Sequence, residues 1–226
     1  MLYIVLLIAG LALITLPGLW AKRTLNRYSA PRQDLTLTGE QLALDLLQKF
    51  KLHHVTIEAA EPQQDHYDPA TKTVRLSPDN LHNNSLTAIT VAAHEVGHAL
   101  QDATQFPGFN LRIRLAVVAH HFNKIGGWVL LLTPVVMAIS RSPTVGLITG
   151  LIAVSSFFMS AAVHLITLPV EIDASFSRAL PILKDCHYLK EQDLKAARRI
   201  LKACAMTYIA QALIELLSFK RRLGRR

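Results

Sequence analysis

Residues 87–101 read TAITVAAHEVGHALQ, and the interpretation of the whole chain begins from this stretch. Its residues are mostly small or apolar, and we predict one helix from about Leu86 to Gln101. His94 and His98 are four residues apart, so both imidazoles project from one face of that helix. Glu95 lies at the edge of the same face. The stretch therefore predicts a buried helix that presents two imidazoles and a carboxylate at one place.

The order His-Glu-x-x-His is the arrangement in which two histidines bind zinc while the glutamate acts on a water molecule. Glu95 is one residue beyond His94, so it can reach such a water without binding the metal. Gly97 costs about 1 kcal/mol in a helix interior relative to alanine. We expect another backbone, or substrate, to approach closely at that position. The pattern predicts a zinc site with His94 and His98 as ligands and Glu95 as the general base.

A catalytic zinc site usually has three protein ligands, one more than the two histidines supply. A longer version of this motif continues with a glycine and a third histidine after His98. This chain has Gln101 and Thr104 at those two positions instead. Glu171 is the leading candidate, because it ends a run of nearly thirty uncharged residues. Asp173 is a rival ligand or a partner that holds the ligands in place. The competing interpretation is a pair of helix histidines with no metal.

Two stretches of the chain together resemble the bacterial YugP-like family of neutral zinc metallopeptidases. They are AAHEVGHALQ at residues 92–101 and LPVEIDAS at residues 168–175. The resemblance extends over nearly the whole chain. It implies a gluzincin-type site in which Zn²⁺ is bound by both histidines and Glu171, with Glu95 as the catalytic base.

One position departs from a more distant pattern. Membrane proteases of the HtpX type, which are similar in part, have an aspartate four residues after the ligand glutamate. This chain has Ser175 at that position. The side chains that support the ligands therefore remain open from the sequence, with Ser175 and Asp173 as the two candidates.

Composition indicates a membrane protein independently of the motif. Hydrophobic residues make up 51% of the chain and charged residues 18%. Three blocks are nearly free of charge and have about the length of a membrane-crossing helix. We therefore expect a mainly α-helical membrane protein with three transmembrane helices, at residues 1–21, 125–141 and 142–168. Ser142 and Pro143 predict a tight connection, so the second and third helices should form a hairpin.

Lysine and arginine flank these blocks, which gives the expected orientation. By the positive-inside rule, the N-terminus lies outside the cell. Residues 22–124 form a cytoplasmic catalytic region, zincin-like and helical with a short β element. Residues 169–226 form a cytoplasmic helical region that carries the third ligand. Residues 203–219 are either an amphipathic helix, which we favour, or a fourth span.

The net charge of +8 does not indicate nucleic-acid binding, because no binding motif accompanies it. We interpret the basic residues as contacts with the acidic head groups of a lipid bilayer.

Local patterns predict several elements of the catalytic region. Thr38 and Gln41 have the spacing of a capping box at a helix start. Asn84 and Ser85 offer an N-cap for the histidine helix. Residues 65–69 are rich in turn-forming residues. Residues 72–77 alternate polar and apolar side chains, so we expect a half-buried strand that could bind an extended substrate by strand addition.

These observations predict a membrane-embedded zinc endopeptidase whose substrate is a peptide or protein, unfolded or associated with the membrane. The alternative from another class is a non-catalytic zinc-binding membrane scaffold or adaptor. An intact Glu95 disfavours the scaffold, because that side chain is needed only for chemistry. A metal transporter is a weak third reading, since His164 alone offers a ligand within the predicted spans.

Overall fold

The computed structural model describes the fold of residues 2–223. Side chains within the long helices are described in part. The structure does not describe the side chains of residues 2–11, 13, 14, 123, 130, 153, 154, 156–162, 164, 165 and 208–223. The side chain of His164, and most of those in the ambiguous stretch 203–219, therefore lie outside the described residues.

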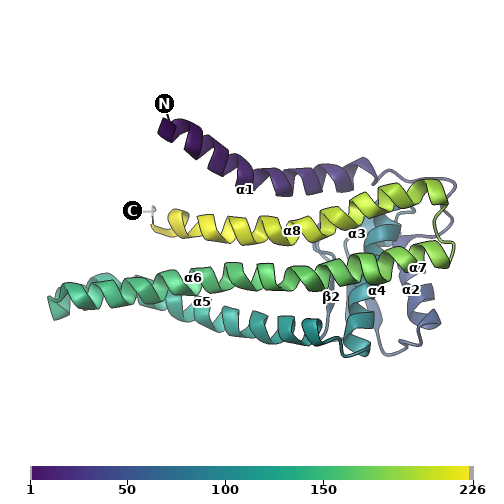
Figure 1. Ribbon diagram of the computed structural model, residues 1–226. Helices are drawn as coiled ribbons and strands as arrows, with labels where there is room; N and C mark the ends of the chain where they lie inside the picture. The colour runs from purple at the N-terminus through teal and green to yellow at the C-terminus, as the bar shows by residue number, and fades with distance from the viewer. Residues whose placement is uncertain (1, 224–226) are drawn as a thin grey trace. The chain divides into compact units, whose positions relative to one another are not determined.

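The described chain is mainly helical and contains one small sheet (Figure 1). The long helices are α1 (Leu2–Arg27), α5 (Pro107–Ser140), α6 (Pro143–Ile172) and α8 (Glu191–Leu223). The shorter helices are α2 (Gly39–Lys49), α3 (Pro78–His82), α4 (Leu86–Ala103), the π-helix η1 (Asp173–Ala179) and α7 (Leu180–Asp185). The strands are β1 (Thr56–Ala59), β2 (His66–Asp68) and β3 (Thr73–Leu76).

The chain forms two compact units, and the long helices contribute to both. The sheet unit consists of Leu16–Asn110 and Pro169–Thr207. The hairpin unit consists, among the described residues, of 2–15, 111–168 and 208–223.

In the sheet unit the strand order is β1-β3-β2, so β3 is the central strand. It pairs in parallel with β1 and antiparallel with β2. The predicted strand at residues 72–77 is thus confirmed, since Val74 and Leu76 are fully buried. Its expected role in strand addition is wrong, because both of its edges are already paired. The strand β2 lies in the stretch that we interpreted as a turn.

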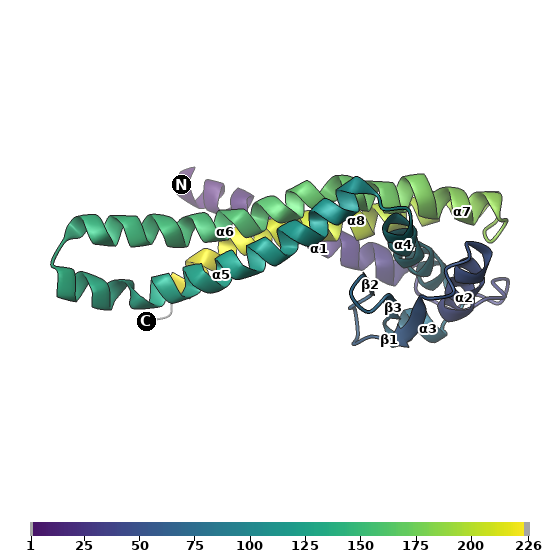
Figure 2. The ribbon, with the colours of Figure 1, turned by 90° about the horizontal axis from the view of Figure 1, so that it is seen from below.

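The helix α4 forms the centre of the sheet unit, and nearly all of its residues are buried. It packs against α2, α3, β2, β3, η1 and α7. Figure 2 shows it beside the sheet. Both predicted caps are confirmed. Ser85 Oγ accepts a hydrogen bond from the amide of Ala88 at 3.1 Å. At the start of α2, Thr38 and Gln41 form the reciprocal capping box.

The hairpin unit contains the predicted tight connection. The helix α5 ends at Ser140 and α6 begins at Pro143, and Arg141 between them has φ = 48°. The two helices lie side by side in both views (Figures 1 and 2). Their approach is close at Gly146, where an added Cβ would be 2.6 Å from the Met137 sulfur.

The prediction of three transmembrane helices, at residues 1–21, 125–141 and 142–168, is wrong. Among the residues described, none of the helices by itself has both the length and the apolar character that a bilayer crossing requires. Two segments of α5 have the required length and apolar character only when they are taken together, and the helix bends by 45° at the break between them. They are Pro107–Val129 and Leu131–Ser140.

Two features of α5 explain why its uncharged block is not a separate straight helix. The block at residues 125–141 is the second half of a longer helix, whose first half carries Arg112 and Arg114. Pro134 lies inside the helix and removes the hydrogen bond to the carbonyl of Leu130, four residues earlier. The ring also clashes with that carbonyl, which accounts for a bend at this position.

The C-terminal segments also differ from expectation. We predicted that residues 203–219 form an amphipathic helix of their own or a fourth span. In the structure these residues are part of one continuous helix, α8, which begins at Glu191.

Candidate metal centre

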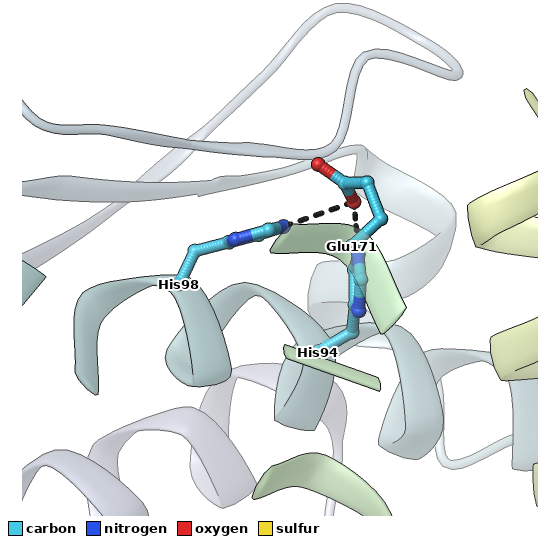
Figure 3. A group of neighbouring side chains, drawn as sticks. All are labelled: His94, His98 and Glu171. Carbon is cyan, nitrogen blue, oxygen red and sulfur yellow. Dashed lines mark hydrogen bonds and ion pairs between the residues drawn. The ribbon is translucent and has the colours of Figure 1, made fainter. Parts of the chain in front are cut away.

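His94 and His98 lie on neighbouring turns of α4, and both imidazoles point toward the carboxylate of Glu171 (Figure 3). The Nε2 atoms are 3.4 Å and 3.2 Å, respectively, from Glu171 Oε2. One possible ligand atom from each residue lies within 4.8 Å of the others. All three side chains are buried, and Glu171 is 0% exposed. The structure therefore brings the three predicted ligands together at one point.

Glu171 reaches this point because it lies in the last turn of α6, directly before the π-helix η1, which packs on α4. The backbones meet at Gly97, where an added Cβ would be only 2.8 Å from the carbonyl oxygen of Ala174. The close backbone approach that we expected at Gly97 is confirmed. A π-helical turn is rare and is often found at functional sites. Here it begins two residues after Glu171.

Each histidine has a hydrogen-bonding oxygen at its other ring nitrogen. Ser175 Oγ lies 3.1 Å from His94 Nδ1, and Gln101 Oε1 lies 2.9 Å from His98 Nδ1. A proton on each Nδ1 leaves the lone pair of each Nε2 facing Glu171. This is the arrangement by which proteins orient metal-binding imidazoles. The predicted supporting role of Ser175 agrees with its contact to His94.

Asp173 lies beside this group and is connected to it through Gln101. Its Oδ2 accepts hydrogen bonds from Gln101 Nε2 and from Arg178 Nε, both at 2.8 Å. Burial opposes ionisation of Asp173, but the bonds from Arg178 and Gln101 outweigh it and lower its pKa. Asp173 thus contacts neither histidine in the bonds described.

Gln101 is the residue that the sequence interpretation missed. A signal was present, because a long polar side chain one turn after His98 in an apolar helix needs polar partners. The sequence could not show which partners these are.

Glu95 follows His94 on α4, and it is 6% exposed. It lies near the thiol of Cys204 on α8. Burial raises the pKa of this thiol, and the negative charge of Glu95 raises it further. The predicted base is therefore next to the histidine pair, in a site largely shielded from solvent.

Aromatic residues cover the outer side of His98. The ring of Phe109 stacks on the imidazole, with centroids 6.0 Å apart, and Tyr67 of β2 lies 6.3 Å beyond it. The Tyr67 hydroxyl donates to Asp102 at 2.7 Å, and Lys72 Nζ reaches the same oxygen. Burial, followed by the bond to Asp102, raises the pKa of Tyr67. These bonds hold the sheet against the last turns of α4.

The donor set fits a zinc ion. Two imidazole nitrogens and one carboxylate oxygen are the three protein ligands of one established class of catalytic zinc site, in which a fourth position is left for water or substrate. The hydrogen bonds at both Nδ1 atoms keep the Nε2 lone pairs available for the ion. A buried carboxylate is also stabilised by a bound cation.

Comparison with known proteins agrees with this chemistry. The family described as "Putative neutral zinc metallopeptidase" matches residues 3–225. A Bacillus subtilis (strain 168) protein named "Putative membrane protease YugP" is 34% identical over 222 residues, which cover 98% of this chain and 95% of that protein. No solved structure matches the chain. The cofactor of the family is zinc, and the structure contains a group of side chains suited to bind it.

Proposed function

Because the chain belongs to the family described as "Putative neutral zinc metallopeptidase", we propose that it is a zinc-dependent endopeptidase. One observation carries the proposal. His94, His98 and Glu171 converge from two distant parts of the chain, and Glu95 lies on the same helix as the histidines. A site that only bound zinc would not need a buried glutamate beside it.

His94, His98 and Glu171 would hold the ion. When bound, zinc activates a water molecule and polarises the carbonyl group of the peptide bond. Glu95 acts as the general base, because its carboxylate accepts a proton from the attacking water. The same carboxyl group then donates this proton to the leaving amine. Burial of Glu95 keeps bulk water away from the proton transfer.

The substrate would be an extended peptide segment of an unfolded or flexible protein. Among the described strands β2 pairs only with β3, so its outer edge can add a further strand. β2 also packs on α4, and its Tyr67 is one ring away from the Phe109 that stacks on His98. A segment added beside β2 would therefore run near the metal-binding group. This proposal replaces the expected pairing with β3.

We also propose that the protein acts at a membrane, with a lipid bilayer as partner and no role for nucleic acid. The name of the B. subtilis relative, a membrane protease, supports this location. The hairpin unit supports it too, because it exposes large apolar side chains, which mark interaction surfaces. They include Ile125, Trp128, Leu131, Val135, Ile139, Leu147 and Leu151. The distribution of lysine and arginine favours the cytoplasmic face for the metal site.

Flotation with phosphatidylcholine vesicles, with and without anionic phosphatidylglycerol, tests the membrane proposal. We expect the wild-type chain to float with vesicles, and Leu131→Glu to float less. Leu44→Glu, at an exposed apolar position of α2, is the matched control and should float like the wild type. A wild-type chain that stays in the bottom fraction with both lipids would contradict this location.

The catalytic proposal is tested by comparing the wild-type chain with Glu95→Gln on an unfolded protein substrate. Metal content is measured on the same samples. We expect both proteins to bind zinc. Cleavage by Glu95→Gln should be about 100- to 10,000-fold slower, which is the usual contribution of a positioned general base. Glu61→Gln, at an exposed position, serves as the control and should cleave normally.

Equal cleavage by the wild type and Glu95→Gln would reject the catalytic role. A wild-type chain that binds zinc and cleaves no substrate would favour the alternative, a non-catalytic zinc-binding scaffold.

A further inference from the structure

Gln101 uses its whole amide group in hydrogen bonds inside the protein. The side chain is 0% exposed. Its Oε1 lies 2.9 Å from His98 Nδ1, while Nε2 donates to the Val170 carbonyl and to Asp173 Oδ2, both at 2.8 Å. A carbonyl oxygen can only accept, so the contact with Val170 identifies the nitrogen end of the amide. The oxygen end therefore faces His98.

This orientation determines the protonation of the imidazole. An amide oxygen accepts but cannot donate, so His98 must carry its proton on Nδ1 to complete the bond. The lone pair is then on Nε2, the atom 3.2 Å from Glu171.

The same side chain holds the segment that supplies the third ligand. Val170 immediately precedes Glu171, and Asp173 is two residues beyond it. Gln101 is therefore hydrogen-bonded to this segment on both sides of Glu171. Asp173 is itself held by Arg178, whose guanidinium lies 5.7 Å from the centre of the Phe106 ring. Phe106 belongs to the turn that follows α4, so the chain of contacts returns to the metal-binding helix.

We infer that Gln101 is a positioning residue for zinc: it orients His98 through Nδ1 and also sets the place of Glu171 through Val170 and Asp173. The inference rests on the proposed zinc site. It extends that proposal by naming one side chain that couples two ligands 73 residues apart in sequence.

Two substitutions separate positioning from packing. Gln101→Leu removes the oxygen that faces His98 and both donors. Gln101→Glu removes the donors but keeps an oxygen for His98. Both changes should lower the unfolding temperature of the zinc-free full-length protein. Zinc affinity, measured by competition with a chromogenic chelator, should fall roughly 10- to 100-fold in Gln101→Leu. We expect a clearly smaller fall in Gln101→Glu.

The carboxylate in Gln101→Glu would lie near that of Asp173, so adding Asp173→Asn should restore part of the lost stability. Gln48→Ala, at an exposed position of α2, is the control and should bind zinc like the wild type. Equal zinc affinities of the Leu and Glu variants would overturn the inference.

A measurement on the wild-type chain does not depend on the folding of any variant. The ¹⁵N chemical shifts of the histidine rings in the zinc-loaded protein report which nitrogen carries the proton. We expect His98 to be protonated on Nδ1, and protonation on Nε2 would overturn the inference. These experiments use zinc and no substrate. A failure to cleave peptides would therefore count against the proposed peptidase activity and leave the role of Gln101 standing.

Discussion

Glu171 and the two histidines are held by side chains that the zinc motif itself does not include. Ser175 faces His94, and Gln101 faces His98. Both supporting residues are 0% exposed, so neither bond competes with bulk water. The orientation of each ring is therefore a property of its buried partner as much as of its own position in α4.

Ser175→Ala is expected to weaken zinc binding about tenfold, the lower end of the range for a lost partner of a ligand histidine. His94 would keep its place in the helix but lose the oxygen at Nδ1. Chelator competition measures the affinity. Ser155→Ala, at an exposed position of α6, should have no effect. An unchanged affinity in Ser175→Ala would show that Ser175 does not orient His94.

Among the elements, the contact between α4 and η1 decides whether the site can form. Gly97 permits it, because an added Cβ would be 2.8 Å from the Ala174 carbonyl, too close for any real side chain. Glycine has poor helix propensity, but at this position it allows the backbones of α4 and η1 to pack in direct contact. The position of Glu171 follows from that packing.

Gly97→Ala is expected to destabilise the protein by about 1 to 3 kcal/mol, as overpacking a dense core usually does. It should also lower zinc affinity, because η1 must move away from α4. Thermal unfolding measures the first effect. Gly127→Ala in α5, where an added Cβ meets nothing within 4 Å, should be neutral or slightly stabilising. A neutral Gly97→Ala would mean that the backbones can separate without cost.

The pairing of β2 with β3 includes an ion pair that makes stability depend on acid. The hydrogen bond from Arg75 holds the pKa of Asp68 at about 2. This is below the value of an unfolded chain, about 3.9. Stability from Asp68 is thus present above pH 4 and is lost as the pH falls toward 2. Asp68→Asn should make the unfolding temperature depend less on pH between pH 4 and pH 2. A pH dependence as steep as that of the wild type would contradict this assignment.

For the whole molecule, the metal site joins two stretches of chain that are far apart in sequence. His94 and His98 belong to Leu16–Asn110, and Glu171 belongs to Pro169–Thr207, the two segments that make up the sheet unit. A ligand that binds only the folded protein stabilises it according to its concentration and affinity. Zinc should therefore act as a cross-link between these segments.

Removal of zinc with a chelator is expected to lower the unfolding temperature of the wild-type chain, and added zinc should restore it. Glu171→Ala should unfold at nearly the same temperature with and without the chelator. Calorimetry on the full chain measures both. If Glu171→Ala responded to zinc as strongly as the wild type, Glu171 would not be a ligand.

Sequence alone was sufficient for features that depend on near neighbours. The spacing of His94 and His98 places them on one helical face whatever surrounds the helix. Ser85 caps that helix through a hydrogen bond to the amide of Ala88, only three residues away in sequence. The cost of Gly97 in a helix predicted a close approach for the same local reason. Glu171 was predicted from an uncharged run and a family resemblance, while its distance to the histidines remained unknown.

Only the tertiary structure decided the features that require distant residues to meet. The place of β3 between β1 and β2, the bonds of Gln101 to Val170 and Asp173, and the bend of α5 are examples. The three uncharged blocks show the limit most clearly, because length and hydropathy did not reveal how the helices continue and bend. Pairing and packing between remote segments depend on the shapes of both partners, which local periodicity does not contain.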